Sequence, residues 1–367
     1  MKRKTWNRTT SKRKASKRKT RSAELRRLAT EKANPASTNL DRKSALEIAR
    51  IINREDAKVA AAVKRALPQI AQGIDLIATA LSQGGRLIYV GTGTSGRIAA
   101  LDAVECPPTF DVDPGMVQFI IAGGSRALGA AVEADEDSRQ LGRKEIARKK
   151  PTKRDVVVGI AASGRTPFTI AALQYARTHG AKTVAVVCNR NSPLGKAAHV
   201  AIVAEVGAEV VAGSTRMKAG TAQKMILNML STGAMTRLGH VYGNLMVNVR
   251  PRNEKLVERG VGIVEKTAGL DHRAARKVLA AAGGRVAVAM VMAKAGVSGA
   301  RAAAALKESQ GQVRRAITLA KREFLQRRKS VTTGGTLRLR SGQAPVHRGK
   351  RAGGVQVGFL AANTPQS

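Results

Sequence analysis

The chain has 367 residues, of which 43% are hydrophobic, so it is long enough for two or three domains and too apolar to be disordered throughout. It holds 65 Lys and Arg residues against 25 Asp and Glu, a formal net charge of +40, and such an excess is typical of proteins that bind nucleic acid. With one Trp, three Tyr and five Phe residues, the chain offers few of the aromatic platforms on which single-strand binders stack bases.

The positive charge is concentrated at the two ends. Residues 1–27 carry 13 basic side chains and one acidic, for +12, and residues 321–367 carry ten and one, for +9. Residues 28–320 carry +19. We expect the two arms to be solvated tails without a partner. The alternative is that they attach the chain to RNA, DNA or another polyanion by releasing counterions.

Cysteine usage and hydropathy bound the compartment. Cys106 and Cys188 are the only cysteines, and two cysteines make neither a disulfide framework nor a Cys-rich zinc site. No apolar run approaches the ~20 residues of a membrane span, and the basic N-terminus lacks the apolar segment of a secretory signal. We therefore expect a cytoplasmic protein with no metal and no membrane partner.

The predicted elements begin after a basic arm, which we expect to be disordered. Helical spacing of apolar residues predicts helices within 41–82, with a new helix starting near Pro68. Short apolar runs then alternate with helical stretches; the runs are 86–90, 117–122, 155–161, 182–188 and 200–204, and the helices 97–104, 127–149 and 167–179. Apolar strands separated by helices are typical of a parallel sheet covered on both faces.

From residue 221 the pattern is helical, and 254–323 reads as several short Ala-rich helices broken by glycines, without strands. We therefore expect four segments. They are a disordered basic arm over 1–35, an α/β domain over 36–253, a small helical domain over 254–327 and a disordered low-complexity tail over 328–367.

Two glycine-containing loops have the character of anion sites. Gly91-Thr92-Gly93-Thr94-Ser95-Gly96 follows a strand and opens a helix, so that backbone N–H groups can approach an anion. The string also matches the GxGxxG of dinucleotide-binding folds, with Asp111 about twenty residues on. The second loop, Ser163-Gly164-Arg165-Thr166, repeats the design after another strand, and 213–221 precedes a third helix.

A dinucleotide fold needs one such loop, whereas several Ser- and Thr-rich loops at the carboxyl ends of parallel strands suit a phosphorylated sugar or polyol. Hydroxyl and N–H groups, those of Gly96 and Gly164 included, would bind the phosphate, and Arg97 or Arg165 would add positive charge. The simpler interpretation is that the hydroxyls cap the helices.

Acidic residues supply candidates for proton transfer. Glu105 precedes Pro107-Pro108, which predict that its helix ends there in an extended exit. Glu133, Asp135, Glu136 and Asp137 form a cluster in AVEADEDSR. Such a cluster is usually a solvated helix face, but crowded carboxylates raise one another's pKa, and a protonated acid opposite an ionised one can perform general acid–base chemistry.

The motifs LIYVGTGTSGR, LDAVECPPTF, VEADEDS, VVVGIAASGRTPF and GAEVVAGSTRMKAGTAQKMILNMLST resemble, in order and spacing, those of the N-acetylmuramic acid 6-phosphate etherase family. That family belongs to the sugar-isomerase-domain (SIS) superfamily, which also contains the glucokinase regulatory protein. The resemblance covers roughly residues 28–320. It implies a SIS-type α/β fold, a parallel-sheet sandwich flanked by helices, and a homodimer whose site is completed across the subunit interface.

The implied reaction cleaves the D-lactyl ether of N-acetylmuramic acid 6-phosphate to N-acetylglucosamine 6-phosphate and D-lactate, in cell-wall amino-sugar recycling. In the ring-opened sugar the C2 proton is α to an aldehyde and the C3 ether is a β leaving group. Elimination followed by water addition therefore needs a base and an acid, but no metal or redox cofactor. The alternative is a non-catalytic regulatory protein that senses a sugar phosphate on the same fold.

The resemblance assigns roles to individual residues. Glu105 would protonate the departing lactate and Glu136 would handle the C2 proton, although the division between the two carboxylates stays open. Two departures from the family pattern flank them: Val104 stands in place of a customary Ser, and Asp135 adds a like charge that would raise the pKa of Glu136. The residues that match the family's phosphate- and sugar-binding loops are Thr94, Ser95, Ser163 and Thr166, with Ser214 as a further candidate.

Overall fold

The computed structural model of the chain describes residues 28–248 and 253–334. The greater part of both basic arms, 1–27 and 335–367, lies outside the described residues. By its internal contacts the chain divides into a unit from Met1 to Phe324 and a second unit from Leu325 to Ser367. Of the second unit only the end of one helix is described.

A five-stranded parallel sheet forms the centre of the α/β part. Its strands follow the order β2-β1-β3-β4-β5. Their bounds are β1 Leu87–Gly91, β2 Val117–Ile121, β3 Val156–Ile160, β4 Lys182–Val187 and β5 Val200–Val203. All five predicted strands are confirmed, because each is a short apolar run long enough to cross the sheet.

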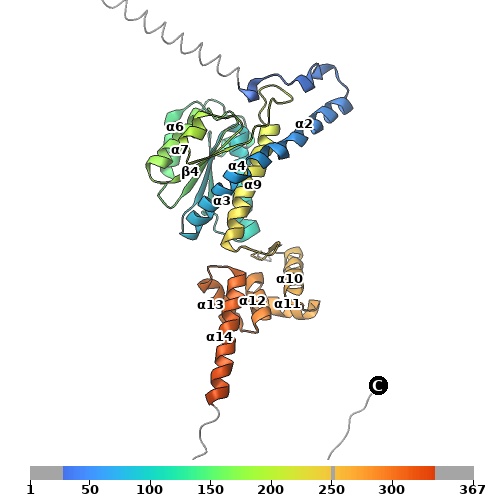
Figure 1. Cartoon of the computed structure of the whole chain (residues 1–367), viewed down its shortest axis with the longest axis vertical. Helices are drawn as coiled ribbons and strands as arrows, with labels where there is room; N and C mark the ends of the chain where they lie inside the picture. The colour runs from blue at the N-terminus through green and yellow to red at the C-terminus, as the bar shows by residue number, and fades with distance from the viewer. Residues whose placement is uncertain (1–27, 249–252, 335–367) are drawn as a thin grey trace, which may run out of the picture. The chain divides into compact units, whose positions relative to one another are not determined.

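Helices cover both faces of this sheet, as the almost wholly apolar strands predict. Along β1, Leu87 and Tyr89 face one hydrophobic cluster, whereas Ile88 and Val90 face another. Figure 1 shows α6 and α7 on one side of the sheet, with α3, α4 and α9 on the other. The first cluster is covered by α2 Ala45–Arg65, α3 Leu67–Ser82, α4 Gly93–Phe110 and α9 Lys218–Leu238, and the second by α6 Arg139–Arg148, α7 Pro167–Thr178 and α8 Pro193–Ala197.

Two helix predictions were wrong. Helix α4 does not end at Glu105 but continues through Pro107 and Pro108 to Phe110. The apolar face outweighs the lost hydrogen bonds there, because Cys106 and Phe110 stay buried in the core. The predicted helix over 127–149 is instead the single turn α5 Arg126–Gly129, a polar turn and α6, so the acidic cluster lies on a turn rather than on a helix face.

The N-terminal boundary of the fold lies earlier than predicted. Residues 28–35, assigned from sequence to the disordered arm, contain the 3-10 turn η1 Ala29–Glu31 and the start of η2 Pro35–Ser37. Thr30 is completely buried, which explains why this stretch is ordered. After η3 Leu40–Arg42, helix α2 begins with a capping box between Ser44 and Glu47.

The C-terminal part of the described chain is helical and has a hydrophobic cluster of its own. A two-stranded antiparallel hairpin, β6 Val241–Tyr242 and β7 Leu245–Met246, precedes it and was not predicted. The helices are α10 Glu254–Ala268, α11 His272–Ala281, α12 Val286–Ala295, α13 Gly299–Glu308 and α14 Val313–Gly334. Helix α14 runs seven residues into the segment predicted as a disordered tail from 328.

Among the described residues, no single helix is long and apolar enough to cross a membrane. Helices α11 and α12 would together be long and apolar enough, but they are bent by 113° relative to each other.

Candidate functional site

The first two predicted loops begin side by side, because the strands that precede them are neighbours. Gly91, the last residue of β1, pairs with Ile160, the last residue of β3. The chain leaves β1 toward β2 on one side of the sheet and later returns as β3 on the other. This reversal is the switch point at which open α/β sheets bind their ligands. The loops open α4 and α7, so two positively polarised helix N-termini lie at the same edge.

The third loop reaches the first from the far end of the sheet. It follows β5 and opens α9. A Cβ atom added to Gly220, in the first turn of α9, would lie 3.4 Å from Thr94 Cγ2. The three loops singled out from sequence therefore meet at the carboxyl edge of the sheet.

The hydroxyl groups of these loops differ in how they are used. Thr92 and Thr166 stand at the N-cap positions of α4 and α7, but neither side chain caps its helix, so the capping interpretation is wrong for both. Ser163 Oγ accepts a hydrogen bond from the Arg165 N–H at 3.2 Å, which leaves its own proton free to donate. Ser95 Oγ lies 3.0 Å from Gln223 Oε1, to which it donates.

Thr94 and Ser214 are half-buried. The two glycines predicted as binding residues also have a clear packing role. A Cβ atom on Gly96 would lie 2.5 Å from Ile121, and one on Gly164 would lie 2.4 Å from Ser192. Arg97 donates through Nη2 to the Ala130 carbonyl at 2.7 Å, which places its charge beside the acidic turn.

Glu136 lies between the first and second loops. Its backbone carbonyl accepts a hydrogen bond from the Phe168 N–H, in the first turn of α7, at 3.1 Å. Its side-chain Oε1 lies 3.2 Å from the position that a Cβ atom would take on Gly93, at the start of α4. A carboxylate is thus placed where two helix N-termini and the hydroxyl-bearing loops converge.

The surroundings raise the pKa of Glu136 above its ordinary value of 4.5. Partial burial is the main cause, and the charges of Glu133 and Asp137 raise the pKa further, whereas the Thr92 hydroxyl and the Arg97 charge lower it. The sequence predicted a raising charge at Asp135, but the charges that act most strongly are the two on either side of it. A carboxyl group tuned in this way suits proton transfer.

Glu105 lies elsewhere on α4. It is exposed and follows Gly93 by 12 residues, which corresponds to about 18 Å along the helix axis. Its neighbours Leu101 and Val104 are 48% and 56% exposed. Within one chain the structure therefore does not bring Glu105 and Glu136 together.

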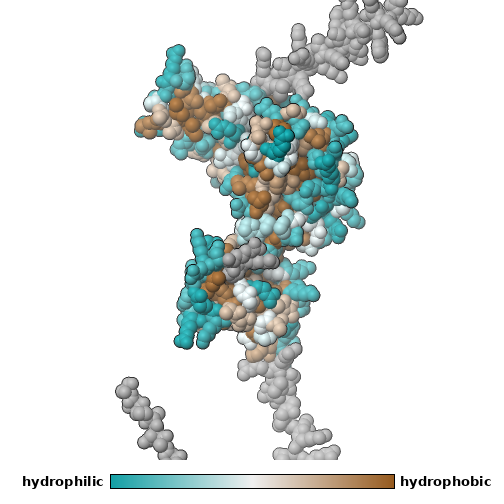
Figure 2. Space-filling view, turned by 180° about the vertical axis from the view of Figure 1, so that it is seen from behind, coloured by the Kyte–Doolittle hydropathy of each residue, from teal (hydrophilic) through white to brown (hydrophobic). Residues whose placement is uncertain are grey.

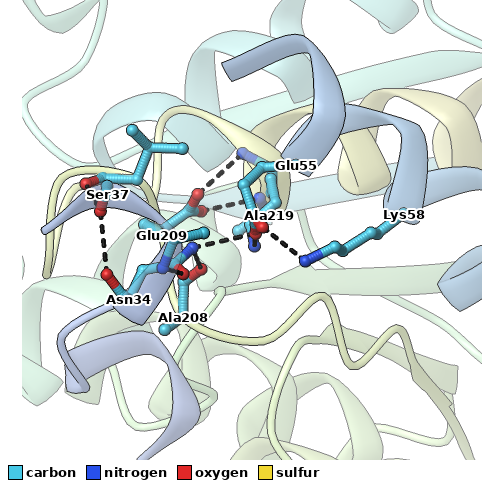
Figure 3. A network of polar contacts seen from close by, with 10 residues as sticks. Asn34, Ser37, Glu55, Lys58, Ala208, Glu209 and Ala219 are labelled. Atoms are coloured by element: carbon cyan, nitrogen blue, oxygen red, sulfur yellow. Dashed lines mark hydrogen bonds and ion pairs between the residues drawn. The ribbon is translucent and has the colours of Figure 1, made fainter. Parts of the chain in front are cut away.

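A buried ionic network that the sequence did not reveal holds the third loop (Figure 3). Lys218 and Glu55 are 1% and 2% exposed, and Lys218 Nζ lies 2.6 Å from Glu55 Oε2. Burial tends to raise the pKa of Glu55, but hydrogen bonds from Lys218, Lys58 and Asn34 outweigh it and lower the pKa to about 2. Glu209, also buried, accepts from the Lys218 and Ala219 N–H groups at 3.0 and 2.9 Å and so fixes the start of α9.

The same network ties down the N-terminal segment. Asn34 Nδ2 donates to Glu55 Oε2 at 2.9 Å and to the Ala208 carbonyl at 3.0 Å. Ser37 Oγ donates to the Val210 carbonyl at 2.7 Å. The Ala29 N–H donates at 3.1 Å to Asn189 Oδ1, just beyond β4. The residues before α2 are thus fastened across the carboxyl edge that carries the loops.

Cys106 and Cys188 are buried, free thiols, and burial raises the pKa of each to about 12. Over residues 28–248 and 253–334, no group of three or more His, Cys, Asp or Glu residues is placed to hold a metal ion.

Known proteins are similar to this chain in sequence over most of its length. The profile of the glucokinase regulatory protein N-terminal SIS domain matches residues 69–177, and that of the SIS domain matches residues 149–233. N-acetylmuramic acid 6-phosphate etherase 1 of Enterococcus faecalis is 48% identical over 289 residues, which are 79% of this chain and 96% of that protein. The N-acetylmuramic acid 6-phosphate etherase of Escherichia coli O1:K1 is 51% identical over 294 residues, 80% and 99% of the two chains. A phosphoheptose isomerase from Francisella tularensis superposes with a TM-score of 0.43 at 19% identity, over 53% of this chain and 100% of that one.

Proposed function

The chain belongs to the N-acetylmuramic acid 6-phosphate etherase family, and from this premise we propose that it cleaves the D-lactyl ether of N-acetylmuramic acid 6-phosphate. The products are N-acetylglucosamine 6-phosphate and D-lactate, and the reaction serves cell-wall amino-sugar recycling. One structural observation carries the proposal: hydroxyl-bearing loops and Glu136 meet at the switch point between β1 and β3.

The phosphate of the substrate binds at the N-termini of α4 and α7. Thr94, Ser163, Thr166 and Ser214 supply hydroxyl donors there, and the helix dipoles favour the negative charge. The substrate also carries a lactyl carboxylate. The excess of +19 over residues 28–320 raises the local concentration of such a doubly anionic ligand.

Glu136 takes the C2 proton of the ring-opened sugar. The electron pair left at C2 forms the C2–C3 double bond and expels the lactate oxygen from C3, which Glu105 protonates. Water then adds at C3: its oxygen bonds to that carbon, the proton that it loses passes to Glu105, and Glu136 returns its proton to C2, so that the sum of the two steps is hydrolysis. The surroundings of Glu136 raise its pKa toward neutral pH, which makes it a better general base.

Because Glu105 is about 18 Å from the first loop along α4, we propose that it acts on the substrate of a partner subunit in a homodimer. Its exposed apolar neighbours Leu101 and Val104 support this arrangement. An apolar groove on the two adjoining helices, α3 and α9, adds to the same kind of surface, and Figure 2 shows hydrophobic side chains at the surface of the α/β part. Residues lining that groove include Leu67, Ile74, Met225, Met229 and Gly233.

We also propose that the protein works in the cytoplasm. Both of its cysteines are free thiols, as is usual in a reducing compartment. The proposed substrate is a phosphorylated sugar, which carries the charge of a metabolite retained inside cells.

Release of D-lactate from N-acetylmuramic acid 6-phosphate tests the proposed function. We expect equimolar D-lactate and N-acetylglucosamine 6-phosphate, and no release from N-acetylmuramic acid that lacks the phosphate. Binding of the phosphorylated sugar without any lactate would instead support the regulatory alternative. A protein that neither binds the phosphorylated sugar nor releases lactate would overturn both functions.

A further inference from the structure

Helices α4 and α9 are joined near the site by one buried hydrogen bond. It runs from Ser95 Oγ, in the first turn of α4, to Gln223 Oε1, in the second turn of α9, over 3.0 Å. Ser95 is 9% and Gln223 1% exposed. The bond therefore lies directly beneath the loop that holds Thr94.

This hydrogen bond uses both groups poorly. A serine hydroxyl has a single proton, and Ser95 spends it on Gln223, so that it has none for a phosphate oxygen. The amide nitrogen Nε2 of Gln223 is buried and has no hydrogen-bond partner within the described chain. A buried donor without a partner is costly. The pair is thus in an arrangement that a bound anion can improve.

The terminal amide of glutamine has nearly the same shape when its oxygen and nitrogen exchange places. In the reversed orientation Nε2 would donate to Ser95 Oγ, and the hydroxyl proton would be free for another acceptor. A hydrogen bond from that hydroxyl to a phosphate oxygen is charge-assisted and stronger than the neutral bond it replaces. Reversal therefore becomes favourable once an anion binds.

We propose that Gln223 is a positioning residue for phosphate recognition: its amide accepts from Ser95 in the free protein and reverses to donate to Ser95 when the substrate phosphate binds. Ser95 then joins Thr94 and Ser163 as a donor to the phosphate. This inference rests on the proposed function for the identity of the anion, but it concerns binding and not the elimination.

A second polar bridge between the same helices provides a control for packing. Ser231 Oγ and Asn228 Nδ2 donate to Asp102 Oδ1 at 3.1 and 2.9 Å. They join α9 to α4 about one and a half to two turns further along than Gln223, away from the loops. A variant such as Ser231→Ala removes a buried hydrogen bond between the two helices without touching the first loop.

The experiment measures the dissociation constant of inorganic phosphate, together with KM and kcat for lactate release. We expect Gln223→Glu to weaken phosphate binding about tenfold or more, because a carboxylate accepts only and repels the anion. The near-isosteric Gln223→Met should weaken it about threefold and raise KM with little change in kcat. Ser231→Ala should leave the phosphate affinity unchanged.

A double-mutant comparison separates positioning from packing. In the Ser95→Ala background, Gln223→Met should change the phosphate affinity less than twofold, because the hydroxyl it would position is gone. Equal losses in both backgrounds, wild-type affinity in both Gln223 variants, or a wild-type protein that does not bind phosphate would each overturn the inference. A wild-type protein that binds phosphate but releases no lactate would overturn the proposed function alone.

Discussion

The two carboxylates assigned to the reaction occupy opposite kinds of environment. Glu136 is half-buried among two helix N-termini, hydroxyl-bearing loops and other charges, and its pKa is raised. Glu105 is exposed on the far half of α4, beside Leu101 and Val104, whose exposure suits an interface and not a catalytic cleft. The loops around Glu136 come together within a single chain. The surface around Glu105 is left exposed in a single chain.

This contrast indicates how the site is divided. In the division that we propose, the carboxyl edge of the sheet would recognise the phosphate and hold the base, because the strand order brings the first two loops together there. Glu105, the proposed acid, lies beside exposed apolar side chains, which a second copy of the chain would cover. In a symmetric dimer each surface is used twice, so that each subunit would lend its acid to the site of the other.

Replacing the base should have the largest effect. Glu136→Gln keeps the shape of the side chain but removes the group that accepts the C2 proton, so we expect kcat for lactate release to fall by about 10²–10⁴-fold. Phosphate affinity should stay near the wild-type value. Glu133→Gln, which changes an exposed neighbour in the same turn, serves as the control and should retain most of the activity. An active Glu136→Gln protein would contradict the assignment.

Replacing the acid tests the division between subunits. Glu105→Gln alone should also reduce kcat by about 10²–10⁴-fold. If the two carboxylates of one site come from different chains, mixed dimers of Glu105→Gln and Glu136→Gln subunits contain one intact site and one doubly altered site. Co-expression should therefore restore about a quarter of wild-type activity by random pairing. Failure to restore any activity, with mixed dimers demonstrated by differential tagging, would place both carboxylates of a site in one chain.

The next effect concerns the stability that the buried network of Glu55 and Lys218 gives to the third loop. Lys218→Met leaves the Glu55 carboxylate buried without its main partner, and breaking a buried pair in this way costs about 3–5 kcal/mol. Denaturant unfolding should show this loss, whereas Lys58→Ala, which removes an exposed partner of Glu55, should cost about 1 kcal/mol or less. A Lys218→Met protein as stable as the wild type would show that the network does not hold the third loop.

The same network gives the wild-type protein a defined acid sensitivity. Because the pKa of Glu55 is lowered from 4.5 to about 2 in the folded chain, its contribution to stability is present above pH 4.5 and is lost as the pH falls toward 2. Between pH 4.5 and 2 the free energy of unfolding of Glu55→Gln should therefore fall less steeply than that of the wild type.

Much of the fold and of the candidate site could be predicted from the sequence. The rest could not, and the reason is physical. The strands and the helices that follow them are local patterns, so the apolar run 86–90 and the GTGTSG string were sufficient to predict β1 and a helix after it, although α4 begins at Gly93 and not at residue 97. The network joins Glu55 to Lys218, which are 163 residues apart, and Gln223 meets Ser95 across 128 residues. No local pattern records such pairs. The predicted end of α4 before Pro107 was wrong for a related reason: the burial of Cys106 and Phe110 outweighed the local tendency of proline to end a helix.

The smallest expected effect tests how the surroundings of Glu136 set its pKa. Thr92 stands beside that carboxyl group, and its hydroxyl lowers the pKa that burial raises. Since the Thr92 side chain does not cap α4, Thr92→Val should remove this influence without loosening the helix. The pKa of Glu136 should then rise further. A base must be ionised to act, so the acidic limb of kcat/KM should move to higher pH, with activity above that limb close to wild type.

Thr92→Ser restores the hydroxyl and should return the limb to its wild-type position, which a purely structural role for the Thr92 methyl group would not do. The acidic limb reports the free enzyme, so the shift should appear in kcat/KM measured well below saturation. An unchanged limb in Thr92→Val, or a shift toward lower pH, would mean that Glu136 is not the base whose ionisation limits the reaction. The loops around Glu136 could then still bind the phosphate, but the C2 proton would have to be taken by another group, such as one on the surface around Glu105.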